Sequence, residues 1–249
     1  MPAIDIATMH RNRLLQTVHE LELARFTDLF TLREFKTGEI LSQPGEKISE
    51  VVFPVDGVFS VVAETSDGDQ VEAGTIGNEG VVGLAPFLGA ESSALRTMCQ
   101  VPGSGLVADV GRLLARADGA LATAARRYSL AFMTMASQGA ACNRLHSIEQ
   151  RAARWLLMVD DRIERNPFQL THEFFAIMLG TTRPSVTLAA AALRKAGLIT
   201  YERGRVTIVD RKGLEEAACE CYLILTEEYE RSTGARLRGR NGDARHTAQ

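Results

Sequence analysis

The sequence predicts an α+β protein in which a β-rich N-terminal half precedes one long helix and a C-terminal unit of two helices and a hairpin. Three observations predict it: glycine-punctuated apolar segments over residues 32–110, helical periodicity from about Gly119, and the order of elements after Leu170. At 249 residues the chain is long enough for two domains with separate cores. The expected divisions are a domain over 1–118, a helix and hinge over 119–146, a second domain over 147–231 and a disordered basic tail over 232–249.

The N-terminal half has the pattern of short strands separated by turns. Apolar stretches flank a turn at Pro54–Gly57, and a hairpin connection follows at Ser66–Asp69. Many short strands with regular turn signals are typical of an antiparallel sandwich or barrel. The preceding residues 11–30 predict a helix that caps this barrel, with one apolar face made by Leu14, Leu15, Val18, Leu21 and Phe26.

The stretch that begins near Gly119 is rich in alanine, leucine and methionine and has no proline, so it predicts one long helix. Apolar residues recur along it at the spacing of a coiled-coil seam, namely Leu121, Ala125, Tyr128, Phe132 and Met135. Such a seam can pack on its own domain or on a second copy of the chain. Because the helix lies between two domains, we favour a dimer interface.

A second helix is predicted to begin at Ser147. Ser147 and Gln150 have the spacing of a capping box, in which each side chain bonds the other residue's backbone N–H. Asn166-Pro167 ends the helix, since the residue before a proline avoids helical backbone angles. The break over residues 143–147 is therefore the predicted hinge between the domains.

From Leu170 onward the order of elements predicts a winged helix-turn-helix. Thr171 can cap a first short helix, Gly180 suits a tight turn, and Thr182 can cap a second helix that ends near Gly197. Two alternating segments over residues 198–209 then form a β-hairpin, the wing. This succession is typical of domains that bind double-stranded DNA, with the second helix in the major groove.

Charge supports this interpretation. Residues 168–212 hold seven basic and three acidic side chains, a local charge of +4 in a chain whose net charge is −3. Arg183 is the predicted base reader, helped by Ser185 and Thr187, because arginine pairs with guanine through two hydrogen bonds. The predicted phosphate contacts are Thr171, Thr182, Arg194, Lys195, Arg203 and Arg205.

From about residue 13 to 231 the chain resembles a bacterial Crp–Fnr transcription regulator. The resemblance rests on the glycines at 38, 45, 57, 68 and 74, on Gly80–Leu84 and on Thr182–Val186. It implies an antiparallel β-roll of the cyclic-nucleotide-binding type, a long dimerisation helix and a winged helix-turn-helix. It also implies a homodimer on palindromic DNA, and it leaves RNA polymerase open as a further partner.

The sequence departs from that family where a cyclic nucleotide would bind. The family's turn places a glutamate on the ribose, and an Arg-Ser or Arg-Thr pair on the phosphate. Here the residue after Gly80 is Val81, and Glu79 stands on the other side of the glycine. The predicted effector pocket comprises Gly80, Val81, Val82, Gly83, Arg96 and Thr97. We expect no usual binding of cyclic AMP or GMP, which leaves an unknown effector or none, and the alternative is a shifted anion site at Arg96-Thr97.

The second helix departs from the family as well. Arg183 is followed by Pro184, and Leu188 stands where relatives with a well-known operator carry a second arginine. We therefore expect the docking geometry of the family but a different DNA sequence as target.

Composition and cysteine usage indicate a cytoplasmic protein with no membrane partner. The chain is 45% hydrophobic and 24% charged, and no segment resembles a signal peptide or a transmembrane helix. Its cysteines are Cys99, Cys142, Cys219 and Cys221, and no histidine completes a zinc-binding spacing. On one helix Cys219 and Cys221 would point about 200° apart. The cysteines are therefore predicted to be small buried hydrophobic residues, with no metal site and no cofactor.

Two other classes of function remain as alternatives. A metal-binding or catalytic barrel is disfavoured, because residues 20–145 contain no histidine and no nucleophile with a nearby base is evident. We therefore expect no enzyme. Haem stays open, although none of His10, His19, His146 and His172 is singled out. A regulatory subunit that binds no DNA is disfavoured by the basic wing.

Overall fold

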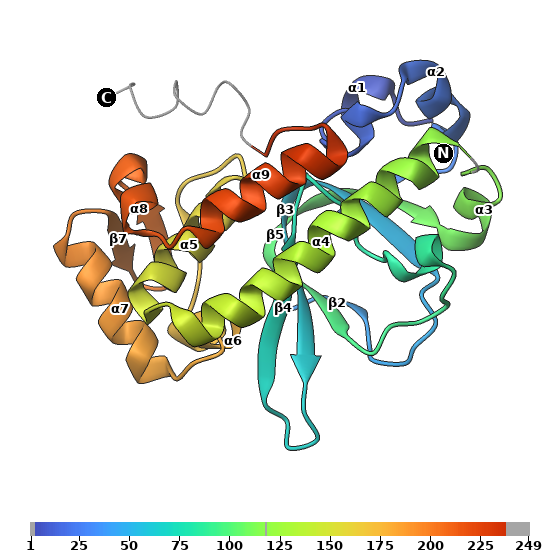
Figure 1. Ribbon diagram of the computed structural model, residues 1–249. Coiled ribbons are helices and arrows are strands. Elements are labelled where there is room, and N and C mark those ends of the chain that lie inside the picture. The colour runs from blue at the N-terminus through green and yellow to red at the C-terminus, as the bar shows by residue number, and fades with distance from the viewer. Residues whose placement is uncertain (1–2, 118, 238–249) are drawn as a thin grey trace.

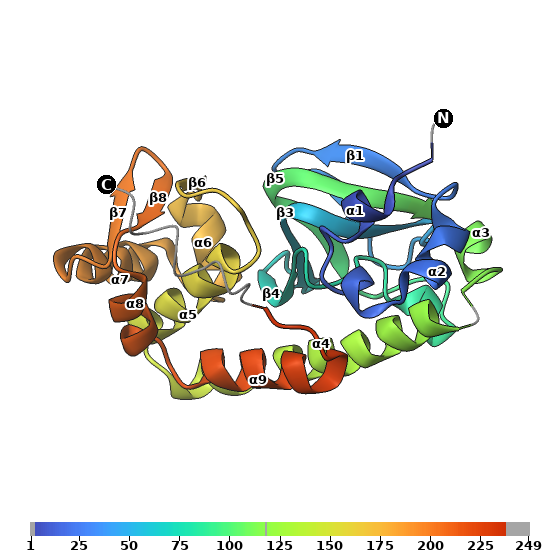
Figure 2. The same ribbon diagram turned by 90° about the horizontal axis from the view of Figure 1, so that it is seen from above.

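The computed structural model describes residues 3–117 and 119–237, and it confirms the predicted fold class (Figure 1). Two lobes, residues 3–117 and 147–217, lie towards opposite ends of a long helix pair and on the same side of it (Figure 2). In the N-terminal lobe the described strands form an antiparallel sheet in the order β1-β5-β3-β4, with β2 paired to β5. These strands are β1 (Thr31–Phe35), β2 (Ile40–Ser42), β3 (Glu50–Glu64), β4 (Gln70–Ile76) and β5 (Arg96–Asp109).

The turn predicted at Pro54–Gly57 is wrong, because these residues continue strand β3. β3 pairs with β5 along its length, with register shifts between Pro54 and Phe59. Gly57 has φ +93°, and a Cβ there would come within 2.8 Å of the Val101 carbonyl oxygen. A β-bulge thus bends the strand without ending it. The hairpin predicted at Ser66–Asp69 is confirmed, since it joins β3 to β4.

The helix predicted over residues 11–30 is broken into short pieces. Val18 is extended, and the His19 ring accepts a hydrogen bond from the Leu21 N–H at 3.2 Å, which starts a new helix. Leu21 is 78% exposed, so it does not belong to the predicted apolar face. The helical pieces of this lobe are α1 (Ile6–Met9), η1 (Leu15–Thr17), α2 (Glu20–Leu23), η2 (Ala24–Phe26), η3 (Ala85–Leu88) and α3 (Val110–Leu114).

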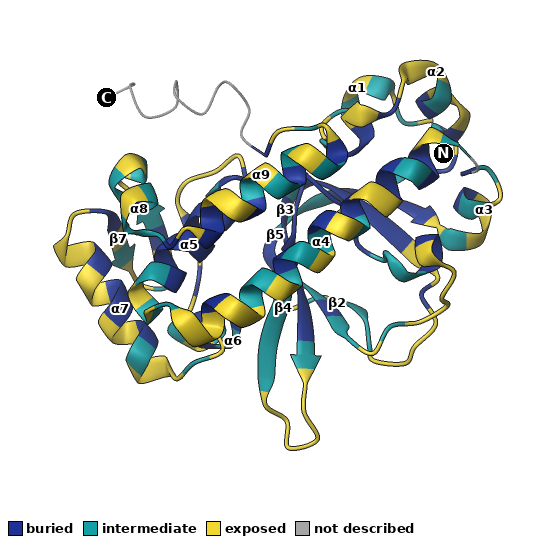
Figure 3. Cartoon of the chain, viewed as in Figure 1, coloured by how far each residue is buried: buried dark blue, intermediate teal, exposed yellow. Residues whose placement is uncertain are grey.

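The predicted long helix is confirmed as α4 (Ala120–Leu145), which at 26 residues is about 39 Å long. The seam predicted to face a second copy packs instead within the chain. Leu121, Ala125 and Tyr128 belong to the core of the N-terminal lobe, and Met135 to the second core. The opposite face of α4 is exposed along much of its length (Figure 3). Periodicity identified the helix, but the predicted seam packs into the chain's own cores.

The C-terminal lobe begins with α5 (Ile148–Asp160), whose predicted capping box is present in both directions at 3.1 and 3.3 Å. Its core surrounds Trp155, which packs on Phe175 with ring centroids 5.0 Å apart. β6 (Phe168–Gln169), β8 (Arg205–Ile208) and β7 (Ile199–Glu202) form a small antiparallel sheet. The remaining helices of the lobe are α6 (His172–Met178), α7 (Arg183–Lys195) and α8 (Arg211–Ala217).

The last helix of the described chain, α9 (Cys221–Thr233), runs back along α4 towards the N-terminal lobe (Figure 2). Ser232 and Thr233 complete this helix, and Leu237 is buried in the core of the N-terminal lobe. Disorder was therefore wrongly predicted for residues 232–237. The rest of the predicted basic tail, residues 238–249, lies outside the described residues.

No single helix of the described chain is long and apolar enough to cross a membrane. Helices α6 and α7 together satisfy such a test by length and composition, although they are bent by 100°. Both bury their apolar faces in the C-terminal core.

Candidate nucleic-acid interface and the lobe junction

Helices α6 and α7 are joined by the tight turn that the sequence predicts. Thr171 caps α6 by accepting a hydrogen bond from the Phe174 N–H at 3.1 Å. Gly180 has φ +54°, a conformation that favours glycine, and a Cβ there would come within 2.8 Å of the Val71 side chain. The turn therefore sets the bend between the two helices.

Helix α7 has one buried and one exposed face. Val186, Ala189 and Leu193 pack into the lobe core. On the other face Leu188 is 70% exposed, and Pro184 and Ala191 lie beside it at helical spacing. A large apolar side chain exposed between basic helix ends is available for contact with another molecule.

The three predicted base readers differ in availability. The Arg183 side chain is 63% exposed, and its ion pair with Glu173, at 3.2 Å, lies at the surface. The Ser185 hydroxyl is 3.0 Å from that of Thr182. The Thr187 hydroxyl donates to the Arg183 carbonyl and lies 3.0 Å from His172 Nδ1. Arg183 can therefore reach outward, whereas both hydroxyls are engaged within the chain.

The predicted phosphate contacts surround α7. Arg194 and Lys195 are exposed at its end, and Arg203 and Arg205 are exposed on the wing. Within residues 3–117 and 119–237, none of these four has an ion pair. Thr182 occupies the N-cap position of α7 without a capping bond.

The wing is a tight hairpin with an open concavity beside it. Arg203 and Gly204, with φ of 48° and 74°, form its two-residue turn, as in the favoured hairpin turn with two positive φ angles. The concavity is lined by Pro167, Thr200, Glu202, Arg203, Arg205 and Thr207.

The predicted effector residues do not come together. Val82 exchanges backbone hydrogen bonds with Val52 on β3, whereas Arg96 and Thr97 pair with Val62 and Val61, at the other end of that strand. The Arg96 guanidinium already bonds two partners, with Glu64 at 2.7 Å and Gln43 at 3.0 Å.

The Gly80 turn is filled by protein atoms. Val81 is fully buried, and a Cβ on Gly80 would lie 2.1 Å from the Tyr128 ring and hydroxyl. The helix α4 therefore packs directly against this turn.

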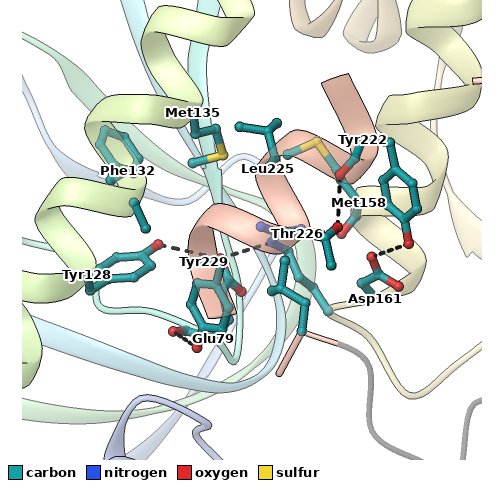
Figure 4. Close-up of a pocket in the computed structure, with 13 residues that line it drawn as sticks. Glu79, Tyr128, Phe132, Met135, Met158, Asp161, Tyr222, Leu225, Thr226 and Tyr229 are labelled. Carbon is teal, nitrogen blue, oxygen red and sulfur yellow. Dashed lines mark hydrogen bonds and ion pairs between the residues drawn. The ribbon is translucent and has the colours of Figure 1, made fainter. Parts of the chain in front are cut away.

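A buried ion pair joins the two lobes, and nothing in the sequence predicted it. Glu79, in the turn after β4, pairs with Arg162, just after α5, at 3.0 Å, and their side chains are 1% and 4% exposed. Tyr128 from α4 donates to the Glu79 carboxylate at 3.4 Å, and Tyr229 from α9 donates to its backbone carbonyl at 2.8 Å (Figure 4). No sequence signal connects two residues 83 positions apart.

The narrow cavity at this junction lies between α4, α5 and α9 (Figure 4). Its free volume is about 20 Å³, about the size of one water molecule. The Glu79 carboxylate is therefore engaged by side chains of the junction.

A second buried contact links β4 to α5. The Glu72 carboxylate accepts hydrogen bonds from the Trp155 indole at 2.8 Å and the Ser60 hydroxyl at 2.6 Å. Burial raises the pKa of Glu72 above its ordinary value. The two hydrogen bonds lower the pKa, but their effect is smaller than that of burial.

Two family models match the chain. A cyclic nucleotide-binding domain matches residues 32–110, and a Crp-like helix-turn-helix domain matches residues 150–217. The chain belongs to the Crp–Fnr family. Together the two models cover more than half of this Crp–Fnr protein, and they match residues before and after the long helix α4.

Solved structures support the same fold for this Crp–Fnr protein. FixK2 from Bradyrhizobium japonicum is 18% identical with a TM-score of 0.65, over 77% of this chain and 98% of that one. A putative Crp/Fnr regulator from Eubacterium rectale is 16% identical, with a TM-score of 0.62, over 84% and 98%. The c-di-GMP responsive global regulator CLP from Xanthomonas campestris is 16% identical, with a TM-score of 0.60, over 76% and 99%. No curated protein sequence matches the chain.

Proposed function

We propose that this Crp–Fnr regulator binds palindromic DNA as a homodimer, with α7 of each copy in the major groove. The observation that carries the proposal is the exposed face of α7, where Arg183 and Leu188 project between basic side chains of the helix end and the wing. A helix of this kind fits the groove, and its first turns meet the base edges.

Arg183 is the proposed base reader. Its surface ion pair with Glu173 contributes little free energy, so DNA can displace it. Ser185 and Thr187 are secondary readers in this proposal, because their hydroxyls must first leave partners within the chain. Leu188 adds an apolar contact suited to a thymine methyl group.

Arg183→Ala is expected to lower affinity for the specific site by roughly 5- to 150-fold while leaving random DNA nearly unaffected. The measurement is competition binding on a site recovered by genome-wide mapping of bound DNA. Arg112→Ala, at an exposed position of α3 in the other lobe, is the matched control. Equal losses on specific and random DNA would exclude Arg183 as a base reader.

Phosphate contacts are proposed for Thr171, Thr182, Arg194, Lys195, Arg203 and Arg205. The double variant Arg203→Ala/Arg205→Ala is expected to make the dependence of log affinity on log salt shallower, by about 0.9 for each phosphate that is no longer neutralised, on any sequence. The control Lys36→Ala/Lys47→Ala removes the same charge from the N-terminal lobe. If the salt dependence of the wing variant were unchanged, the wing would not contact the DNA phosphate backbone.

The proposed dimer interface is the exposed face of α4. Leu130, Met133, Ser137 and Ala140 lie there at coiled-coil spacing, and Leu130 and Met133 are 44% and 60% exposed. The small residues Ser137 and Ala140 would allow two α4 helices to approach closely. The seam predicted from the sequence cannot form this interface, because its side chains pack into the chain's own cores.

We propose that this protein does not bind a cyclic nucleotide in the family's usual way. A buried phosphate needs a cation, and Arg96 is already paired with Glu64. The alternative, a shifted anion site at Arg96-Thr97, predicts uptake of labelled cyclic AMP that Arg96→Gln abolishes. Absence of uptake by the wild-type protein in equilibrium dialysis is the result we expect.

A further inference from the structure

Three cysteines and one histidine, distant in the sequence, meet where the two lobes join. Cys142 lies in the last turn of α4 and His146 follows that helix, while Cys219 precedes α9 and Cys221 begins it. Their ligand atoms all lie within 4.8 Å of one another. The two helix ends are side by side in Figure 2.

The expectation that Cys219 and Cys221 point apart is wrong for a local reason. Cys219 stands before α9, so the two cysteines are not two positions of one helix. His146 has extended backbone angles that end α4. The cysteines are buried as predicted, but with a histidine among them.

The distances match a tetrahedral metal site. The sulfurs of Cys142 and Cys219 are 3.5 Å apart, and Cys221 Sγ is 3.5 Å from His146 Nδ1. With metal–sulfur bonds of about 2.3 Å and a metal–nitrogen bond of about 2.0 Å, tetrahedral geometry requires ligand separations of roughly 3.5–3.8 Å. We propose that Cys142, His146, Cys219 and Cys221 bind one Zn²⁺ ion.

The surroundings support a metal site beyond the four ligands. Glu220 Oε1 lies 3.1 Å from His146 Nε2, so it can accept that N–H and orient Nδ1 towards the ion. Gln138 donates to the Cys221 sulfur at 3.2 Å. Both are contacts of the kind that hold metal ligands in place in known zinc sites.

Two buried arginines supply compensating charge. Three thiolates, a neutral imidazole and Zn²⁺ carry a net charge of −1. Arg151 and Arg154 are 5% and 7% exposed, and neither has an ion pair with a carboxylate within the described part of the chain. The charges of both arginines act on Cys142.

The ion would tie together the entry and exit of the C-terminal lobe. Residues 147–217 lie between the two halves of the ligand set, so the ion closes this whole lobe into one loop at its hinge. The site has four protein ligands and buried sulfurs, as structural zinc sites do, and it holds the orientation of α7 relative to α4.

Metal analysis of the full chain, purified under reducing conditions, tests the proposal. We expect about one zinc per chain, and loss of zinc in Cys142→Ser and Cys219→Ser. Cys99→Ser is the matched control, because Cys99 is a buried cysteine in the other lobe and should leave the zinc content unchanged. Glu220→Gln, at an exposed position, should keep the ion but weaken its affinity roughly tenfold in competition with a chelator.

Cobalt substitution in the wild-type protein gives an answer even if the serine variants do not fold. Tetrahedral Co²⁺ bound by three thiolates should show thiolate-to-metal charge transfer and intense visible bands. Wild-type protein that holds no zinc and gives no such bands would overturn the proposal. So would iron with acid-labile sulfide at the site, a Cys142–Cys219 disulfide in place of metal, or equal zinc loss in Cys99→Ser.

Discussion

Arg162→Met is expected to lower the free energy of unfolding by about 3–5 kcal/mol, because it leaves the Glu79 carboxylate buried without its countercharge. Arg162 is 4% and Glu79 1% exposed at the junction of the two lobes. The remaining donors to that carboxylate, Tyr128 and the Gly77 N–H, are neutral. The charge of the partly buried Arg13 guanidinium also acts on Glu79, but Arg13 has no ion pair with it in the described chain, so it replaces the lost partner only in part. Denaturant unfolding followed by the fluorescence of Trp155, the single tryptophan, measures the change close to the junction.

Two further variants separate the buried pair from general damage. Glu79→Gln combined with Arg162→Met removes both charges, so the double variant should lose less than the sum of the single losses. Arg165→Met breaks a more exposed ion pair with Asp56 at the same junction and should cost less than about 1 kcal/mol. If Arg162→Met and Arg165→Met had the same small effect, the Glu79–Arg162 pair would not be what holds the lobes together.

The double variant Leu130→Glu/Met133→Glu is expected to convert the proposed dimer to a monomer and to lower affinity for a palindromic site about 10²-fold or more. Four carboxylates would meet in an apolar interface, where their desolvation is unfavourable. A monomer engages one half-site and loses the gain that comes from linking two binding domains. Sedimentation velocity measures the mass, and binding to full and half sites measures the loss.

Exposed leucines elsewhere provide the control for added charge. Leu21→Glu/Leu88→Glu places two carboxylates at positions that are 78% and 60% exposed in the N-terminal lobe. This variant should keep both the mass and the affinity of the wild-type protein. A dimer that survives Leu130→Glu/Met133→Glu would move the interface away from this face of α4.

Much of the C-terminal lobe could be predicted because its signals are local. The capping box of Ser147, the cap of Thr171 and the turn at Gly180 each depend on atoms within a few residues of one another. The hairpin at Arg203-Gly204 is local for the same reason. Local signals are therefore enough to predict α7 and the wing without knowledge of any long-range contact.

Errors arose where the outcome depended on packing. The helix over residues 11–30 broke at His19, whose ring captures a backbone N–H, and the turn at Pro54–Gly57 became a bulge because β5 pairs along all of β3. Each segment had the expected residue types. The break at His19 comes from a local capping contact, whereas the conformation of Pro54–Gly57 was decided by β5, which is distant in the sequence.

The sequence by itself determined the order of elements, the long helix and the basic winged helix-turn-helix, because hydrophobic period, capping residues and turn residues act over short distances. The tertiary structure alone decided which face of α4 is buried, that Glu79 pairs with Arg162, and that Cys142 and His146 meet Cys219 and Cys221. These contacts join residues about 75 or more positions apart. Only the packing of α9 on α4, and of one lobe on the other, brings such residues within bonding distance.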